Sequence, residues 1–84
     1  MSYEEARALC IEFANNFNLE LTESYGKGED KIIEVICNEA AAQSEEFIAL
    51  NHELTNGVIN IWKDDVEHRC GYVYEHFVIA FYNI

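Results

Sequence analysis

The chain has 84 residues, half of them hydrophobic and 13% aromatic, with sixteen acidic residues against five basic ones and a net charge of -11. This apolar content excludes an intrinsically disordered chain, and the length predicts a single domain over residues 1–84. The negative charge repels nucleic acid and anionic lipid, so we expect direct binding to neither.

The cysteines and the N-terminus indicate a cytoplasmic protein. Cys10, Cys37 and Cys70 are odd in number and widely spaced, which argues against a disulfide framework. The longest apolar run, residues 77–82, is far shorter than the ~20 residues of a membrane-spanning helix. The N-terminal sequence MSYEEAR is acidic and lacks the layout of a secretory signal.

The N-terminal segment predicts a first helix over residues 2–17. Ser2 and Glu5 have the spacing of a capping box, in which the Ser2 hydroxyl accepts a hydrogen bond from the backbone N–H of Glu5. Apolar side chains then recur at helical spacing, at Tyr3, Ala6, Leu9, Cys10, Phe13 and Phe17. Residues 15–18 include three Asn, which have low helix propensity, so we expect the helix to end there.

Residues 30–56 predict a second, long helix. Its expected apolar side consists of Ile32, Ile33, Ile36, Ala40, Phe47, Leu50 and Leu54. A polar stripe that begins at Lys31 and Glu34 continues to Glu45 in the same helical phase. Gly57 is expected to cap the C-terminal end, because Gly adopts the left-handed conformation at little cost.

The same region allows a second interpretation, in which residues 19–25 and 31–37 pair as a β-hairpin. Residues 19–23 alternate between apolar and polar, residues 25–28 have the Gly-rich composition of a turn, and Ile32 begins a run of β-branched residues. The phase of the polar stripe favours the helix. The sequence alone leaves open whether residues 31–37 form helix or strand.

The character of the chain changes after Gly57. Residues 58–63 and 70–83 are rich in β-branched and aromatic residues and predict two strands, joined by a polar connection. The expected fold is therefore α+β, with two N-terminal helices (about 2–17 and 30–56) packed on a C-terminal antiparallel β-hairpin (about 58–63 and 70–83).

The predicted last strand has apolar side chains on both faces, and two helices can cover only one of them. An isolated two-stranded ribbon is marginally stable in water. We therefore expect a homodimer through residues 72–82, joined about a two-fold axis. The residues expected on this dimer or partner strand are Tyr72, Tyr74, His76, Val78 and Tyr82.

The histidines and cysteines make only a weak case for metal binding or catalysis. His68 and Cys70 would share one face of a strand, with His76 further along, and both residue types are zinc ligands. The sequence has no CxxC or HxxxH pair, and no turn of the oxyanion type accompanies a Cys and His that could act as nucleophile and base. We expect no metal, no cofactor and no enzymatic activity.

The acidic residues are the strongest indication of function. Up to Asn56 there are twelve acids and three bases, so this part carries -9 of the net charge of -11. Because so few bases lie among them, their repulsion costs stability, and such a surface attracts a basic partner. The acidic face expected to bind that partner consists of Glu34, Glu39, Glu45, Glu46 and Glu53.

In charge and length the chain resembles phage-encoded anti-defence inhibitors, such as anti-CRISPR and anti-restriction proteins. The resemblance implies a small non-enzymatic inhibitor that binds the basic nucleic-acid-binding surface of another protein. An antitoxin or immunity protein that neutralises a cognate nuclease has the same physical requirements. A third alternative is a dimeric structural or scaffold subunit, in which the strand surface makes the contacts and the acids maintain solubility.

Overall fold

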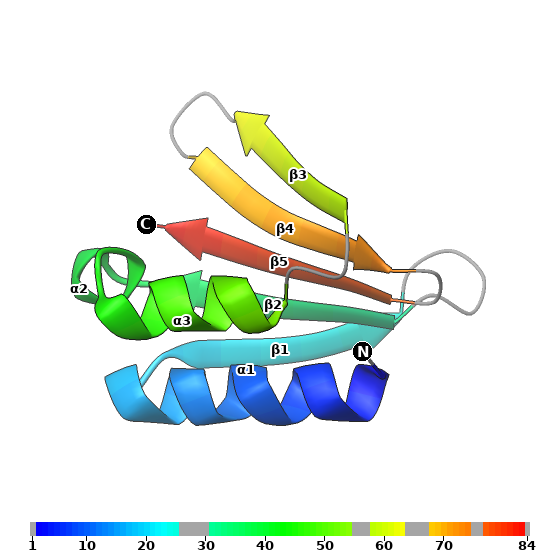
Figure 1. Ribbon diagram of the computed structural model, residues 1–84, viewed down its shortest axis with the longest axis horizontal. Helices are drawn as coiled ribbons and strands as arrows, with labels where there is room; N and C mark the ends of the chain where they lie inside the picture. The colour runs from blue at the N-terminus through cyan, green and yellow to red at the C-terminus, as the bar shows by residue number, and fades with distance from the viewer. Residues whose placement is uncertain (1, 26–30, 55–57, 64–67, 75–76, 84) are drawn as a thin grey trace.

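The computed structural model describes residues 2–25, 31–54, 58–63, 68–74 and 77–83; in the last three segments it describes the side chains of residues 71–72, 74 and 77–82. The elements are α1 (Tyr3–Phe17), β1 (Glu20–Tyr25), β2 (Lys31–Cys37), α2 (Glu39–Ala42), α3 (Glu45–Glu53), β3 (Val58–Lys63), β4 (His68–Tyr74) and β5 (Phe77–Asn83). The described strands form a five-stranded sheet in the order β1-β2-β5-β4-β3, and the helices lie on one face of it (Figure 1). The expected α+β class is confirmed.

The predicted first helix is confirmed, with Ser2 as its cap. Ser2 Oγ accepts a hydrogen bond of 3.2 Å from the backbone N–H of Glu5, which satisfies one donor of the first turn. At the other end Asn18 is left-handed, with φ of 55°, and its N–H donates to the carbonyls of Ala14 and Asn15. Asn tolerates this conformation better than most residues, so the helix stops where the sequence predicts.

The predicted long helix over residues 30–56 is wrong, and the hairpin interpretation is correct. β1 and β2 pair antiparallel, and burial along β2 has a period of two, with Ile33, Val35 and Cys37 buried. Helical and strand periods are hard to distinguish over so short a run. The β-branched side chains pack on the pleated surface beside β5, and this packing decides for the strand.

Two separate caps divide the rest of the predicted helix. The Asn38 side chain accepts a hydrogen bond of 2.8 Å from the N–H of Ala41 and starts α2. Ser44 Oγ accepts one of 3.1 Å from the N–H of Phe47 and starts α3. Such side-chain bonds compete with a continuous helix, so the chain begins a new one at each cap. The predicted turn covers residues 25–28, of which Tyr25 is the last residue of β1. Residues 26–28 and the predicted cap at Gly57 lie outside the described residues.

The predicted strand over residues 70–83 is two strands, because β4 ends at Tyr74 and β5 begins at Phe77. They pair antiparallel, with Tyr72 opposite Ile79. β3 and β4 also pair antiparallel, as the predicted C-terminal hairpin requires. In addition β5 pairs in parallel with β2, and this non-local pairing places the last strand at the centre of the sheet.

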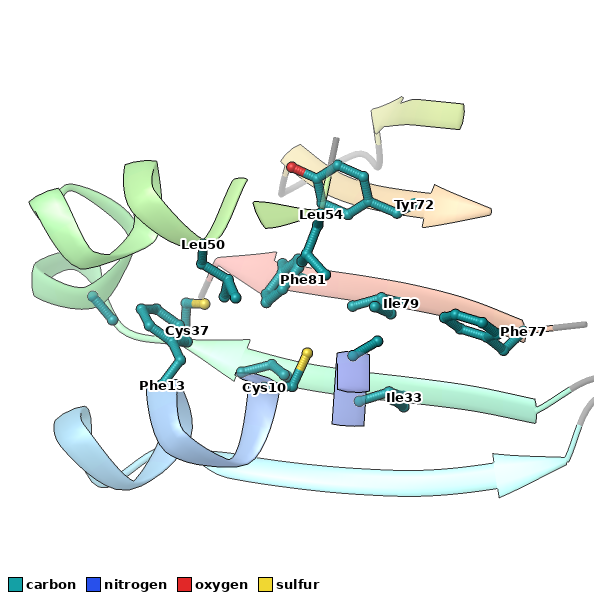
Figure 2. Close-up of a cluster of buried hydrophobic side chains, with 13 residues drawn as sticks. Cys10, Phe13, Ile33, Cys37, Leu50, Leu54, Tyr72, Phe77, Ile79 and Phe81 are labelled. Atoms are coloured by element: carbon teal, nitrogen blue, oxygen red, sulfur yellow. The ribbon is translucent and has the colours of Figure 1, made fainter. Parts of the chain in front are cut away.

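The hydrophobic core lies between the helices and the sheet. Phe81 of β5 has its ring centroid 5.3 Å from that of Phe47 and 6.3 Å from those of Phe13 and Tyr72. Figure 2 shows the Phe81 ring among side chains that come from both layers. These edge-on contacts join α1, α3, β4 and β5 through one side chain.

Tyr72 and Tyr74 fasten β4 to α3. Tyr72 is 1% exposed and its hydroxyl donates to the side-chain oxygen of Asn51, while the Tyr74 hydroxyl donates to the Leu54 carbonyl at 2.7 Å. The two tyrosines therefore face the helices, on the same side of the sheet as Phe81.

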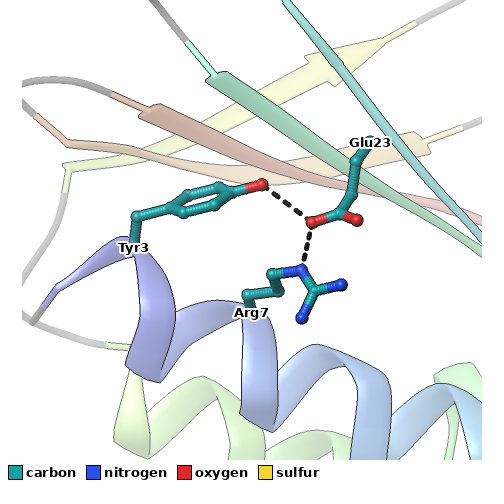
Figure 3. A network of polar contacts seen from close by, with 3 residues as sticks. All are labelled: Tyr3, Arg7 and Glu23. Atoms are coloured by element: carbon teal, nitrogen blue, oxygen red, sulfur yellow. Dashed lines mark hydrogen bonds and ion pairs between the residues drawn. The ribbon is translucent and has the colours of Figure 1, made fainter.

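Tyr3 connects the start of α1 to the edge of the sheet. Its hydroxyl donates a 2.8 Å hydrogen bond to Glu23 Oε1 on β1, and Arg7 Nε donates to the same oxygen (Figure 3). These bonds from Arg7 and Tyr3 lower the pKa of Glu23, while burial and the bond to Glu23 raise the pKa of Tyr3 to about 12. The Tyr3 ring also lies edge-on to Phe77 at 5.6 Å and under the Lys31 ammonium at 4.5 Å.

We expect Tyr3→Ala to lower the free energy of unfolding by about 2 kcal/mol, because it removes a half-buried ring together with its aromatic and cation–π contacts. Tyr3→Phe keeps the ring and loses one exposed hydrogen bond, so its cost is expected to stay below about 1 kcal/mol. Urea unfolding followed by circular dichroism measures both. Equal losses in the two variants would show that the hydroxyl, and not the ring, makes the connection.

Candidate functional site

A groove of about 200 Å³ opens between α1 and α3, which run antiparallel across the sheet (Figure 1). It is lined by Leu9, Glu12, Phe13 and Asn16 of α1 and by Glu46, Ala49, Leu50 and Glu53 of α3. In both helices the lining residues have the spacing i, i+3, i+4 and i+7, so each helix contributes a single stripe along one face.

The groove combines an apolar floor with an acidic rim. The floor consists of Leu9, Phe13, Ala49 and Leu50, and the rim carboxylates are Glu12, Glu46 and Glu53. Phe13 is fixed by ring contacts with Phe17 at 5.3 Å and with Phe47 at 5.8 Å. Because α3 starts at Ser44, Glu46 falls in its first turn, where a negative side chain is favoured by the helix dipole.

The described Lys and Arg side chains interact with residues outside this groove. Arg7 forms an ion pair with Glu23, and Lys31 lies over the Tyr3 ring. None of the described side chains that line the groove is Lys or Arg. The rim carboxylates are therefore not neutralised from within the lining, and the groove suits an apolar side chain flanked by basic groups.

The structure brings only part of the predicted acidic face together. Glu46 and Glu53 lie at the groove. Glu39 and Glu45 are exposed in the first turns of α2 and α3, outside the groove lining.

Glu34 is separated from the other four predicted acidic residues by the sheet. It lies on β2 between the buried Ile33 and Val35, so it points to the face opposite the helices. The expected single acidic face depended on residues 31–37 being helical, and the strand divides it.

Glu12 is the groove carboxylate that the predicted acidic face omitted. It lies on α1 and belongs to the Leu9–Asn16 stripe. One pattern in the sequence could have indicated Glu12. The groove residues of α1 and those of α3 have the same helical spacing, and each set places Glu beside apolar residues.

The residues expected on the dimer or partner strand are also divided. Val78 and Tyr82 lie on the face of the sheet opposite the helices, whereas Tyr72 and Tyr74 face the helices. His76 lies outside the described residues.

Cys10 is a buried free thiol in the described part of the chain. Burial raises the pKa of the Cys10 thiol to about 12, which keeps it protonated. Among the described residues, no three His, Cys, Asp or Glu side chains gather in a way that could hold a metal ion. The side chains of His68 and Cys70 lie outside the description.

Within the described segments, none of the helices combines the length and the apolar character needed to cross a membrane. No protein-family model, curated protein or solved structure matches the chain.

Proposed function

We propose that the protein is a small acidic inhibitor without enzymatic activity, which binds the basic nucleic-acid-binding surface of another protein. The observation that carries this proposal is the groove between α1 and α3, where three carboxylates surround an apolar floor. Surfaces that bind nucleic acid present Lys and Arg to phosphates and frequently place aromatic or apolar side chains among them. In the proposed complex, Glu12, Glu46 and Glu53 occupy positions that phosphates would take.

The overall charge supports the same proposal. A net charge of -11 on 84 residues produces a long-range field that raises the association rate with a cationic surface and weakens as salt screens it. The apolar floor contributes contacts that salt does not screen. The affinity is therefore expected to fall gradually as the salt concentration rises.

The similarity in charge and length to phage anti-defence inhibitors points to nucleases that act on phage DNA as targets. Affinity capture from a bacterial lysate at low salt, with elution at high salt, identifies the partner. The purified partner is then bound to a fluorescent DNA duplex, and the protein is titrated in. The proposal requires that it displace the DNA.

The decisive comparison uses Glu46→Lys and Glu45→Lys. These neighbours lie in the same turn of α3 and give the same change in net charge, but only Glu46 lines the groove. We expect Glu46→Lys to weaken displacement about tenfold or more, since it places a cation against a basic surface, and Glu45→Lys to weaken it much less. Adding Glu12→Lys and Glu53→Lys to Glu46→Lys should abolish displacement. Equal effects of Glu45→Lys and Glu46→Lys would contradict the groove as the binding site.

A further inference from the structure

The groove between α1 and α3 has room for one large side chain. Its volume is about 200 Å³. For comparison, an apolar cavity of ~150 Å³ holds a benzene molecule. The lining residues of each helix extend over two turns, which is ~10 Å along the helix axis. The groove therefore fits a single ring-sized group rather than a row of side chains.

A small residue keeps the groove open above its floor. Phe13 and Leu50 are 4% and 6% exposed, whereas Ala49 is exposed although it also lines the groove. Ala49 carries only a methyl group, so a larger side chain at this position would occupy the space that a ligand needs.

The rim adds hydrogen-bond acceptors to this apolar floor. Glu46 and Glu53 are the first and last lining residues of α3, Glu12 lies on α1, and all three are exposed. Carboxylates accept hydrogen bonds from neutral N–H and O–H groups, and stronger ones from Lys and Arg. Trp and Tyr combine a large apolar ring with one such donor. A Trp or Tyr side chain therefore suits both the floor and the rim, whereas a purely aliphatic side chain suits the floor alone.

Surfaces that bind single-stranded nucleic acid carry the complementary set of side chains. They stack bases on aromatic rings inside a groove that Lys and Arg make positive. An aromatic ring with basic neighbours is thus available on a target of the kind proposed above.

We propose that the groove binds one Trp or Tyr side chain of the target, on which a base of the nucleic acid otherwise stacks. Lys or Arg side chains beside this ring pair with Glu12, Glu46 and Glu53. This inference rests on the proposed function and specifies the chemistry of the partner at the groove. The ring lies against Phe13 and Leu50, where its burial contributes affinity that salt does not screen.

Fluorescence anisotropy with short labelled peptides tests this proposal. The first peptide is Arg-Lys-Gly-Trp-Gly-Lys-Arg, and two others of equal charge have Leu or Ala in place of Trp. The Ala peptide measures the attraction that net charge alone produces. For the wild type, the dissociation constant of the Trp peptide is expected to be about tenfold or more below that of the Ala peptide. It is expected to be about threefold below that of the Leu peptide.

Ala49→Leu fills the groove without changing the charge of the protein. It is expected to raise the dissociation constant of the Trp peptide about tenfold and to leave that of the Ala peptide unchanged. Ala40→Leu is the matched control, because it places the same side chain at an exposed position of α2 outside the groove lining. It should leave both dissociation constants unchanged, and far-ultraviolet circular dichroism checks that both variants are folded.

Equal dissociation constants for the Trp and Ala peptides would overturn the proposal, as would a preference for Trp that survives in Ala49→Leu. A Leu peptide that binds as tightly as the Trp peptide would overturn the choice of an aromatic side chain. The displacement of DNA from the partner is measured without any peptide, so it tests the proposed function separately. Displacement without a preference for Trp would keep the inhibitor and overturn the aromatic occupant, whereas a preference for Trp without displacement would do the reverse.

Discussion

Phe81→Ala is expected to lower the free energy of unfolding by about 3–5 kcal/mol. Phe81 is 3% exposed and lies on the central strand β5. Its ring contacts those of Phe13, Phe47 and Tyr72, which come from α1, α3 and β4. Removing it leaves a cavity bordered by several elements, and these are too constrained by the sheet to close it. A domain of this size has a total stability of only about 4–13 kcal/mol, so the variant should be close to unfolding.

Urea denaturation measures this loss, and Tyr25→Ala is the control. Tyr25 is also an aromatic residue on a strand, but it is 78% exposed, so its removal is expected to change stability by less than about 0.5 kcal/mol. A loss below about 1 kcal/mol for Phe81→Ala would contradict its central place in the core.

Raising the pH above about 9 is expected to destabilise the fold, mainly through Cys10. Burial raises the pKa of its thiol from 9.0 to about 12. Below pH 9 the thiol is protonated in both the folded and the unfolded chain, and its contribution to stability is fully present. Between pH 9 and 12 only the unfolded chain releases the proton, so the free energy of unfolding falls by about 1.4 kcal/mol per pH unit.

Urea denaturation at a series of pH values between neutral and alkaline measures this slope. In Cys10→Ala no thiol is present at this position, so the alkaline slope should become shallower, although the variant is less stable at neutral pH. Tyr3 acts in the same direction, since its pKa is raised from 10.0 to about 12. Tyr3→Phe removes the contribution of this hydroxyl to the alkaline slope. An unchanged slope in Cys10→Ala would show that Cys10 is not the group responsible.

The local signals at the N-terminus and after Gly57 predict local structure correctly, whereas the helical stripe over residues 30–56 does not. The Ser2 cap, the apolar spacing and the Asn-rich end define α1 within one residue. The β-branched composition after Gly57 identifies strand structure, although it does not separate β4 from β5. These features depend on neighbouring residues alone, so the sequence contains what is needed to predict them.

The arrangement of β2 depends on contacts that the sequence does not display. Its partner β5 is more than forty positions away along the chain, and the parallel pairing between them decides that Ile33 and Val35 face the core. The same pairing places Glu34 on the face of the sheet opposite the helices. Similarly, the groove exists because the sheet sets α1 and α3 side by side, so neither helical stripe identifies it alone.

The order of the strands determines when the sheet can form as the chain leaves the ribosome. β5 lies between β2 and β4, although it follows both in the chain. The β1–β2 hairpin and the β3–β4 hairpin are therefore not joined into one sheet until β5 has been synthesised. One edge of β2 therefore leaves the ribosome well before the strand that pairs with it. An unpaired strand edge is prone to aggregation, and the sheet cannot be completed until β5 pairs on both sides.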